Sequence, residues 1–138
     1  MVRRYAGRAY LDIELKVSGE VQPVLNALGD TESNRFVISS FVPEVLEETK
    51  ARRLDLPLGL ICENSRQLRK WPHLPVSAVM VHYLMVSGKL VEDLHSAGKQ
   101  IFVWTVNRAI TMRRLAALGV DGIISDDTQL LVHTLKKN

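Results

Sequence analysis

Cysteine is nearly absent from this chain of 138 residues, which contains only Cys62. A single thiol cannot form a disulfide within the chain, so the sequence excludes a disulfide-stabilised scaffold and favours a reducing compartment. Long apolar runs are also missing, because no stretch approaches the roughly 18 apolar residues that a transmembrane helix requires. The basic N-terminal residues are not followed by the apolar segment of a signal peptide. We therefore expect a cytoplasmic protein without a membrane span.

Aromatic residues and charge of one sign are scarce as well. The chain has two tryptophans, three tyrosines and three phenylalanines, and its formal net charge is only +3. Proteins that bind nucleic acids usually concentrate basic residues on one face, and those that bind single strands add exposed aromatic side chains. The composition therefore argues against a nucleic-acid partner, although its sign is compatible with a small phosphate-bearing substrate.

Several local motifs of well-known sites are missing. The sequence has no zinc-ligand spacing, no glycine-rich phosphate loop and no G-x-S-x-G nucleophile turn. Cys62 has no histidine near it in the sequence, which gives little support to thiolate chemistry. A functional site must therefore be built from residues that lie far apart along the chain.

Six short runs rich in β-branched or aromatic residues predict β-strands. They are Tyr10–Val17, Phe36–Ser40, Leu58–Cys62, Ala78–His82, Ile101–Val106 and Gly122–Ser125. Amphipathic helical patterns lie between them, and this alternation predicts an α/β fold with parallel strands and outer helices. One of the two middle runs, Leu58–Cys62 or Ala78–His82, is expected to fall short of a full barrel strand. The length permits one domain.

Capping signals mark the expected helix ends. The expected N-caps are Ser87, Asn107 and either Asp126 or Asp127, Pro43 suits a first helical turn, and Gly29, Gly98 and Gly119 are the expected stops. For Asn107 and Asp126, capping competes with a role in ligand binding, and the spacing favours capping for Asn107.

The first predicted strand carries an unusual charged face. Asp12, Glu14 and Lys16 alternate with three aliphatic residues, and side chains on a strand change face at every residue, so the three charged groups share one face. Such a face suits the lumen of a closed barrel that opens onto a polar site. An edge strand with a solvated face and Glu–Lys pairs is the alternative interpretation.

Two further candidates lie where strands end, at the edge where α/β folds place their sites. His82 ends the fourth run and is either a general base or phosphate donor, or a hydrogen-bonded structural histidine. Trp104 is either the wall of a pocket or a buried anchor, and an anchor needs a partner for its indole N–H.

Five motifs in order resemble the glycerophosphodiester phosphodiesterase family. They are LDIELK at 11–16, VISSF at 37–41, PLGLI at 57–61, IFVWTVN at 101–107 and GVDGIISDD at 119–127. The resemblance runs from about residue 9 to residue 131, and the pairing of WTVN with GVDGIISD is its most specific part. Small departures are Asp12, where asparagine is common, and Ser125, where threonine is common.

The resemblance implies a TIM-type (β/α)8 barrel that hydrolyses glycerophosphodiesters to an alcohol and glycerol 3-phosphate in lipid metabolism. It implies a divalent metal, Mg²⁺ or Ca²⁺, with Glu14 as a ligand and Lys16 as a catalytic cation near the phosphate. It also makes Trp104 a wall of the substrate pocket, and we add His82 to the expected substrate contacts.

One departure from the family pattern is large. The His-Arg-Gly motif, the Pro-Glu-Asn-Thr segment and the Glu-Leu-Asp strand with a second catalytic histidine do not occur in this sequence. The family's acid and base histidines and the other metal-binding carboxylates are thus missing. We expect residues 1–138 to be one partial domain, the C-terminal portion of such a barrel, which begins about where the fourth barrel strand would.

That expectation has functional consequences. A single glutamate would bind metal weakly or not at all, and loss of acid–base catalysis costs about 10²- to 10⁴-fold in rate, so the chain alone should have little or no activity. We expect the open barrel to be closed by self-association or by a complementary chain. A misassigned start codon or a truncated gene would also explain the missing motifs. The alternative function is a catalytically silent barrel fragment that binds phosphate esters or a protein.

Overall fold

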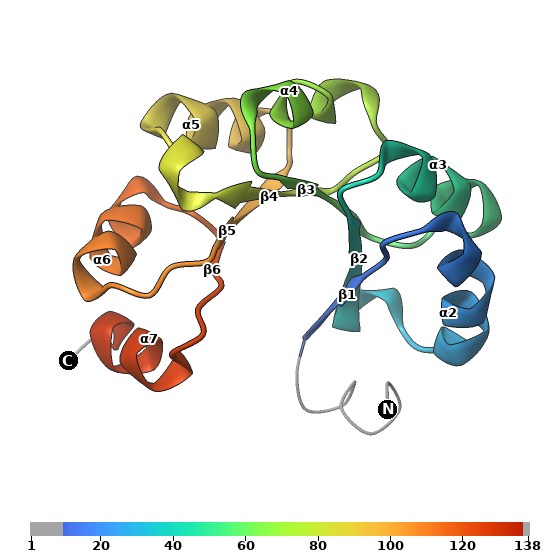
Figure 1. Cartoon of the computed structure of the whole chain (residues 1–138), viewed down its shortest axis with the longest axis horizontal. Helices are drawn as coiled ribbons and strands as arrows, with labels where there is room; N and C mark the ends of the chain where they lie inside the picture. The colour runs from blue at the N-terminus through green and yellow to red at the C-terminus, as the bar shows by residue number, and fades with distance from the viewer. Residues whose placement is uncertain (1–9, 137–138) are drawn as a thin grey trace. The chain divides into compact units, whose positions relative to one another are not determined.

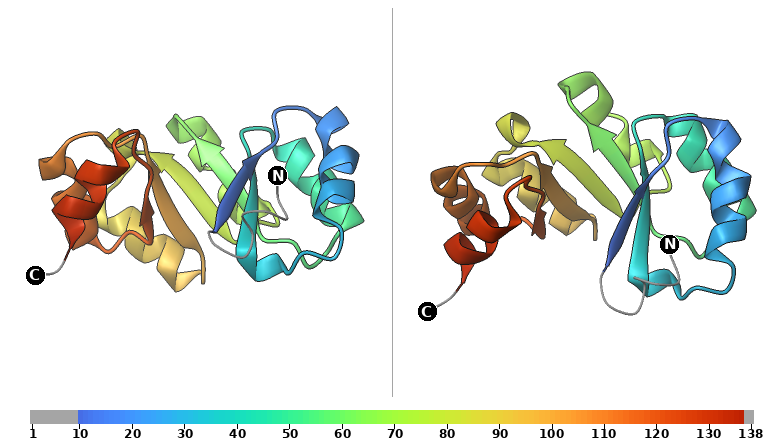
Figure 2. Two further views of the ribbon diagram at one scale, coloured as in Figure 1. Left: turned by 90° about the horizontal axis from the view of Figure 1, so that it is seen from below. Right: turned by 60° about the horizontal axis from the view of Figure 1, so that its bottom comes forward.

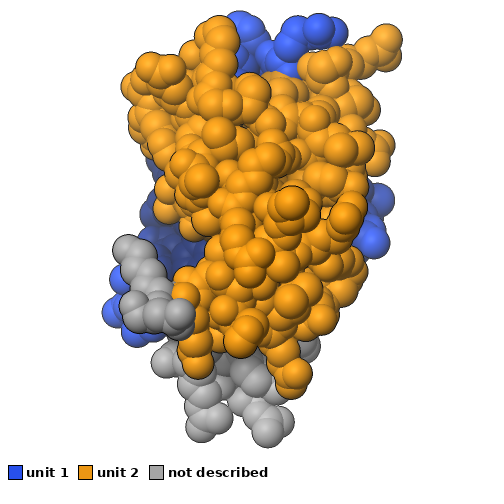
Figure 3. All heavy atoms as spheres, turned by 90° about the vertical axis from the view of Figure 1, so that its left-hand side faces the viewer, with its two compact units in different colours: residues 1–61, 69–77 blue, residues 62–68, 78–138 orange. Residues whose placement is uncertain are grey.

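The computed structural model describes residues 10–136. The chain divides into two compact units, which Figure 3 shows in different colours. Unit 1 comprises residues 1–61 and 69–77, and unit 2 comprises residues 62–68 and 78–138. Each unit is a run of parallel strands connected by helices, as the alternating pattern predicts.

Unit 1 contains a parallel ladder of three strands. Its elements are β1 (Leu11–Glu14), η1 (Ser18–Glu20), α2 (Val21–Leu28), η2 (Ser33–Arg35), β2 (Phe36–Ser40), α3 (Pro43–Arg52), β3 (Leu58–Cys62) and η3 (Trp71–His73). β1 pairs with β2, Glu14 lying opposite Ser39, and β2 pairs with β3, Ile38 lying opposite Leu58. Figure 1 shows α2 and α3 beside these strands.

Unit 2 repeats the arrangement. Its elements are α4 (Ser65–Leu68), β4 (Ala78–His82), η4 (Tyr83–Met85), α5 (Gly88–Ser96), β5 (Gln100–Trp104), α6 (Ala109–Leu118), β6 (Gly122–Ile123) and α7 (Thr128–Leu135). β5 lies between β4 and β6 and is parallel to both, and His82 lies opposite Trp104. Figures 1 and 2 show α6 and α7 side by side at the C-terminal end of this unit.

β2, β3 and β4 are the most buried strands, and β5, at the centre of the unit 2 ladder, is only partly buried. All five residues of β2 are buried, whereas exposed and half-buried residues alternate along β1. In unit 2 the core includes Leu94, Ile101, Met112 and Leu115, each with no exposed surface. Burying a large aliphatic side chain stabilises a fold by about 1.5–3 kcal/mol. These residues are therefore the main source of stability in their units.

The predicted strand boundaries are confirmed for β2, β3 and β4. Leu58–Cys62 and Ala78–His82 both form five-residue strands, so the lengths of β3 and β4 do not support the expectation that one of these runs falls short of a full barrel strand. The other three runs were predicted too long. β1 ends at Glu14. The Leu15 N–H still donates to the Ser39 carbonyl at 2.8 Å, but the Lys16 N–H donates to the Glu20 carboxylate at 2.7 Å. β6 ends at Ile123, although the Ile124 N–H still donates to the Val103 carbonyl at 2.8 Å.

Most capping predictions are confirmed. The side chains of Ser87 and Asp127 accept the N–H groups of Leu90 and Leu130, at 3.2 and 2.8 Å, and so cap α5 and α7. Gly119 ends α6 with a φ of 85°, a conformation that glycine adopts without strain. The prediction for Asn107 is wrong: the N-cap of α6 is Arg108, whose side chain makes no capping bond.

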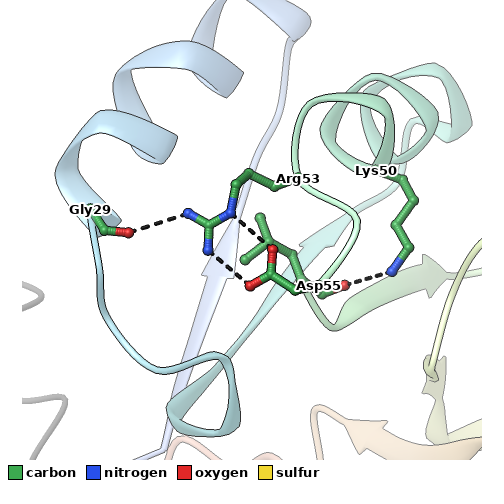
Figure 4. Close-up of polar contacts among 5 residues, drawn as sticks. Gly29, Lys50, Arg53 and Asp55 are labelled. Atoms are coloured by element: carbon green, nitrogen blue, oxygen red, sulfur yellow. Dashed lines mark hydrogen bonds and ion pairs between the residues drawn. The ribbon is translucent and has the colours of Figure 1, made fainter.

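An arginine holds the loops at the amino ends of the unit 1 strands (Figure 4). Arg53 donates two hydrogen bonds of 2.9 Å to Asp55 and a third of 3.2 Å to the Gly29 carbonyl. The guanidinium holds the pKa of the Asp55 carboxyl below its usual value. Lys50 donates a hydrogen bond to the Leu56 carbonyl, which ties α3 to the segment that enters β3. We interpret this cluster as structural, because α/β sites form at the opposite, carboxyl ends of the strands.

Among the helices of residues 10–136, none combines the length and the apolarity needed to cross a bilayer.

Candidate functional site

The charged face of β1 has the predicted alternation. Asp12, Glu14 and Lys16 are exposed, whereas Leu11 and Ile13 are half-buried and Leu15 is buried. No ion pair or hydrogen bond within residues 10–136 engages the Glu14 carboxylate or the Lys16 ammonium. β1 is an edge strand with an exposed face, as the alternative interpretation expects, but the Glu–Lys pair of that interpretation does not form within the described residues.

The backbone beneath Lys16 is well fixed. Ser40 donates a hydrogen bond of 2.6 Å from its hydroxyl to the Leu15 carbonyl, and the same hydroxyl accepts the Val42 N–H. The Glu20 carboxylate accepts the Lys16 N–H. These bonds hold the end of β1 in place, so the ammonium of Lys16 extends from an anchored backbone.

Asp12 adds a second carboxylate to this face. Its Oδ1 accepts a 2.6 Å hydrogen bond from the Ser39 hydroxyl on β2. Partial burial raises the pKa of Asp12, and the nearby Glu14 charge raises it further, while the bond from Ser39 opposes the shift. Asp12 and Glu14 thus place two carboxylates on β1, a surface that favours a cation over an anion. The sequence showed the shared face but not the bond from Ser39, which depends on the register of β1 against β2.

The described residues do not form a metal site on their own. Mg²⁺ takes six oxygen ligands and Ca²⁺ takes about six to eight, several of which normally come from protein. Residues 10–136 contain no group of three or more histidine, cysteine, aspartate or glutamate side chains that could hold a metal ion. Proteins of the glycerophosphodiester phosphodiesterase type generally depend on a divalent metal, but the donors present here, Asp12 and Glu14, are too few to hold one.

His82 and Trp104 lie side by side at the carboxyl ends of β4 and β5. Their ring centroids are 5.3 Å apart, in an edge-to-face arrangement. The Trp104 indole N–H donates to the Met80 carbonyl at 3.1 Å, so this side chain has the partner that an anchor needs. His82 Nδ1 accepts the Leu84 N–H at 3.4 Å, as expected of a structural histidine.

Asn107 connects two loops at the same edge of unit 2. Its amide nitrogen donates to Asp126 Oδ2 at 2.8 Å, and its oxygen accepts the Asp126 N–H and the Ser125 hydroxyl. The Ser125 hydroxyl also accepts the Asp127 N–H. The WTVN and GVDGIISD motifs are therefore joined through Asn107, which explains physically why the two segments occur together.

Cys62 has no features of a nucleophile. It is buried at the end of β3, and burial raises the pKa of its thiol to about 12. At neutral pH the thiol stays protonated, and only the thiolate is nucleophilic. This agrees with the low weight that the sequence gave to thiolate chemistry.

The structure thus groups the four candidate residues in pairs. Glu14 is the last residue of β1 and Lys16 lies two residues beyond it, both exposed in unit 1. His82 and Trp104 are in contact in unit 2. Sequence reasoning missed two positioning interactions, those of Ser39 and Asn107. Ser39 lies near the end of β2 and Asn107 follows β5, and both are small polar residues. Such residues indicate the carboxyl edge of the sheet but do not identify the hydrogen-bond partner.

Short parallel strands alternating with helices, with polar side chains at their carboxyl ends, define a part of a TIM-type barrel, as predicted. The family model of the glycerophosphoryl diester phosphodiesterase family matches residues 3–130. The chain therefore belongs to this family, whose characterised members are phosphoric diester hydrolases, and the resemblance seen in the motifs is confirmed.

Individual relatives agree. The chain is 33% identical over 105 residues to the glycerophosphodiester phosphodiesterase of Caldanaerobacter subterraneus subsp. tengcongensis, covering 75% of this chain and 43% of that protein. It superposes with a TM-score of 0.86 and 24% identity on a Silicibacter pomeroyi structure assigned as a glycerophosphoryl diester phosphodiesterase, covering 96% and 52%. With an Oleispira antarctica phosphodiesterase in complex with the product sn-glycerol-3-phosphate, the TM-score is 0.83 at 21% identity, covering 99% and 58%.

The chain spans about half the length of these relatives. The structural similarity confirms the partial-barrel fold.

Proposed function

We propose that residues 1–138 form one partial domain of a glycerophosphodiester phosphodiesterase, which hydrolyses glycerophosphodiesters in lipid metabolism only when the rest of the barrel is supplied. The observation that carries the proposal is the charged face of β1. Glu14 and Lys16 are exposed and have no side-chain partner within residues 10–136, and the backbone at Leu15 and Lys16 is fixed by Ser40 and Glu20. Opposite charges at the end of a strand and two residues beyond it are suited to a metal and a phosphate.

Each candidate residue has one role in this proposal. Glu14 binds a divalent cation, Mg²⁺ or Ca²⁺, together with ligands that residues 10–136 do not supply. Lys16 offsets the negative charge of the phosphate. Trp104 and His82 contact the substrate, and the bond from Trp104 to Met80 fixes the indole plane. The lone cysteine favours the cytoplasm as the compartment.

The edges of the two ladders suggest how the barrel is completed. Within residues 10–136, β1 pairs only with β2, and β6 pairs only with β5. An unpaired strand edge is a template for another chain. We propose that the chain self-associates or binds a complementary chain, and a compact monomer in sedimentation velocity would contradict this.

Hydrolysis of glycerophosphocholine tests the activity. We expect the chain alone to show no turnover with Mg²⁺ or Ca²⁺, because it lacks the acid–base histidines of the family. Adding the N-terminal half of the Caldanaerobacter relative should produce metal-dependent turnover. Glu14→Gln should abolish that turnover, whereas Glu47→Gln, which removes an exposed glutamate of α3, should not. Equal turnover in the two variants would contradict the role of Glu14.

Binding of glycerol 3-phosphate tests the alternative, a silent fragment that binds phosphate esters. The observation that supports the silent fragment is the Lys16 ammonium, which has no ion-pair partner within residues 10–136. Isothermal titration should show binding that Lys16→Met weakens about tenfold. Lys70→Met, which removes another exposed lysine of unit 1, is the control. Binding without any turnover after complementation would favour the silent fragment over the enzyme.

A further inference from the structure

A cavity of about 260 Å³ opens between two loops at the carboxyl ends of β4 and β5. It is lined by Tyr83, Thr105, Val106, Asn107, Arg108 and Thr111. All six belong to unit 2. Pockets that enclose a whole drug-sized ligand start at about 300 Å³, so this cavity suits one chemical group rather than an entire substrate.

The lining is rich in hydrogen-bond donors and contains no carboxylate. Tyr83, Thr105 and Thr111 carry hydroxyl groups, and Arg108 carries a guanidinium. Within residues 10–136, no side chain forms an ion pair with Arg108 and no group accepts a hydrogen bond from its guanidinium. The Asn107 amide nitrogen donates to Asp126 Oδ2 at 2.8 Å, so one of its two N–H groups is already used. A permanent cation that has no partner among the described residues, in a lining that also carries hydroxyl groups, favours an anionic occupant.

The cavity lies next to the proposed substrate contacts through the Tyr83 ring, which lines it. The Tyr83 ring lies 4.6 Å from the ring of His82, measured between centroids, and the His82 ring lies 5.3 Å from that of Trp104. Thr105 follows Trp104 directly in the chain. A substrate that contacts His82 and Trp104 can therefore extend a further group over Tyr83 toward Arg108.

We propose that this cavity binds an anionic group, a phosphate or a carboxylate, on the alcohol portion of the glycerophosphodiester. The inference rests on the proposed function and specifies its substrate class: diesters whose alcohol carries additional negative charge. Arg108 then acts as the residue that determines specificity. A cationic alcohol such as choline can contact the Tyr83 ring in this lining, but it is repelled by the like charge of Arg108.

The first test measures binding without requiring turnover. Inorganic phosphate is titrated into ¹⁵N-labelled chain at constant ionic strength, with chloride as the reference anion, and the amide shifts of residues 105–111 are followed. We expect saturable shifts that Arg108→Gln weakens about tenfold. Arg113→Gln, an exposed arginine of the same helix outside the lining, should leave them unchanged. Non-saturating shifts, or equal loss in both variants, would overturn the proposal.

The second test distinguishes a substrate group from free phosphate. The affinities of a glycerophosphoinositol phosphate and of glycerophosphocholine are compared by isothermal titration. We expect the anionic diester to bind about tenfold more tightly, and Arg108→Gln to remove the difference. Equal affinities in the unmodified chain, together with Arg108-dependent phosphate binding, would identify a site for free phosphate and overturn the substrate assignment. Because both tests measure binding, an absence of turnover would count against the proposed function and not against the cavity.

Discussion

The two units hold their candidate site residues in opposite ways. In unit 1, Glu14 and Lys16 are exposed and make no side-chain bonds within the described residues, so all their interaction energy is available to a ligand. In unit 2, Trp104, His82 and Asn107 are each fixed by hydrogen bonds to backbone or neighbouring side chains. The candidate residues of unit 1 therefore supply exposed charges, whereas those of unit 2 supply side chains held in fixed positions. Substitutions at these positions should affect stability in unit 2 and leave it nearly unchanged at Glu14 and Lys16 in unit 1.

The largest effect is expected at Trp104. Trp104→Ala removes a large half-buried ring and its bond to Met80, and should lower the free energy of unfolding by about 3 kcal/mol. Trp104→Phe keeps a ring and loses only the N–H bond, so it should cost about 1 kcal/mol. Urea denaturation followed by circular dichroism measures both. If both variants were as stable as the unmodified chain, Trp104 would not be an anchor.

Gly122 should be nearly as sensitive. A Cβ atom there would come within 2.7 Å of the Phe102 ring, so Gly122→Ala must displace that ring and should cost about 1–3 kcal/mol. Gly19→Ala in unit 1 is the control, because a Cβ atom there meets nothing within 4 Å. Thermal unfolding of both variants checks the contrast, and equal midpoints would contradict it.

Asn107→Ala should cost about 1–2 kcal/mol, because the Asp126 amide and carboxylate lose their partner in the loop that precedes α7. Hydrogen exchange at the Asp126 amide should accelerate in this variant. Asn26→Ala, which removes one exposed bond with Gln22 on α2, is the matched control and should cost about 0.5 kcal/mol or less. Unchanged exchange at Asp126 would show that Asn107 does not hold the loop.

The smallest effect is expected at Asp12 in unit 1, where the substitution should raise the free energy of unfolding instead of lowering it. Because folding raises the pKa of Asp12 above 3.8, the folded chain loses stability as the pH rises through that raised value. Asp12→Asn should therefore stabilise the chain at pH 7 by less than about 1 kcal/mol, and the gain should vanish at pH 3.

Ser39→Ala provides the opposite test at the same site. It removes the bond that lowers the pKa of Asp12, so it should destabilise the chain at pH 7. Urea unfolding at the two pH values measures both variants. Destabilisation by Asp12→Asn at pH 7 would contradict the direction of the shift.

Sequence periodicity located the strands well where both faces are buried. β2, β3 and β4 have the predicted bounds, because continuous apolar runs end where polar residues begin. It placed the ends of β1 and β6 poorly. Beyond Leu15 the Lys16 amide bonds to the Glu20 carboxylate, and beyond Ile124 the Asp126 amide bonds to the Asn107 side chain. Bonds of this kind join residues whose proximity exists only after folding.

The sequence by itself determined the family, the parallel α/β class and the alternation of Asp12 and Glu14 with aliphatic residues along β1, because alternation and motif order are local properties of the chain. Only the tertiary structure decided that Ser39 binds Asp12, that His82 lies against Trp104 and that Arg108 lines a cavity without a carboxylate. The first of these contacts depends on strand register and the others on which loops meet at the edge of the sheet. Both are set by packing between segments distant in sequence.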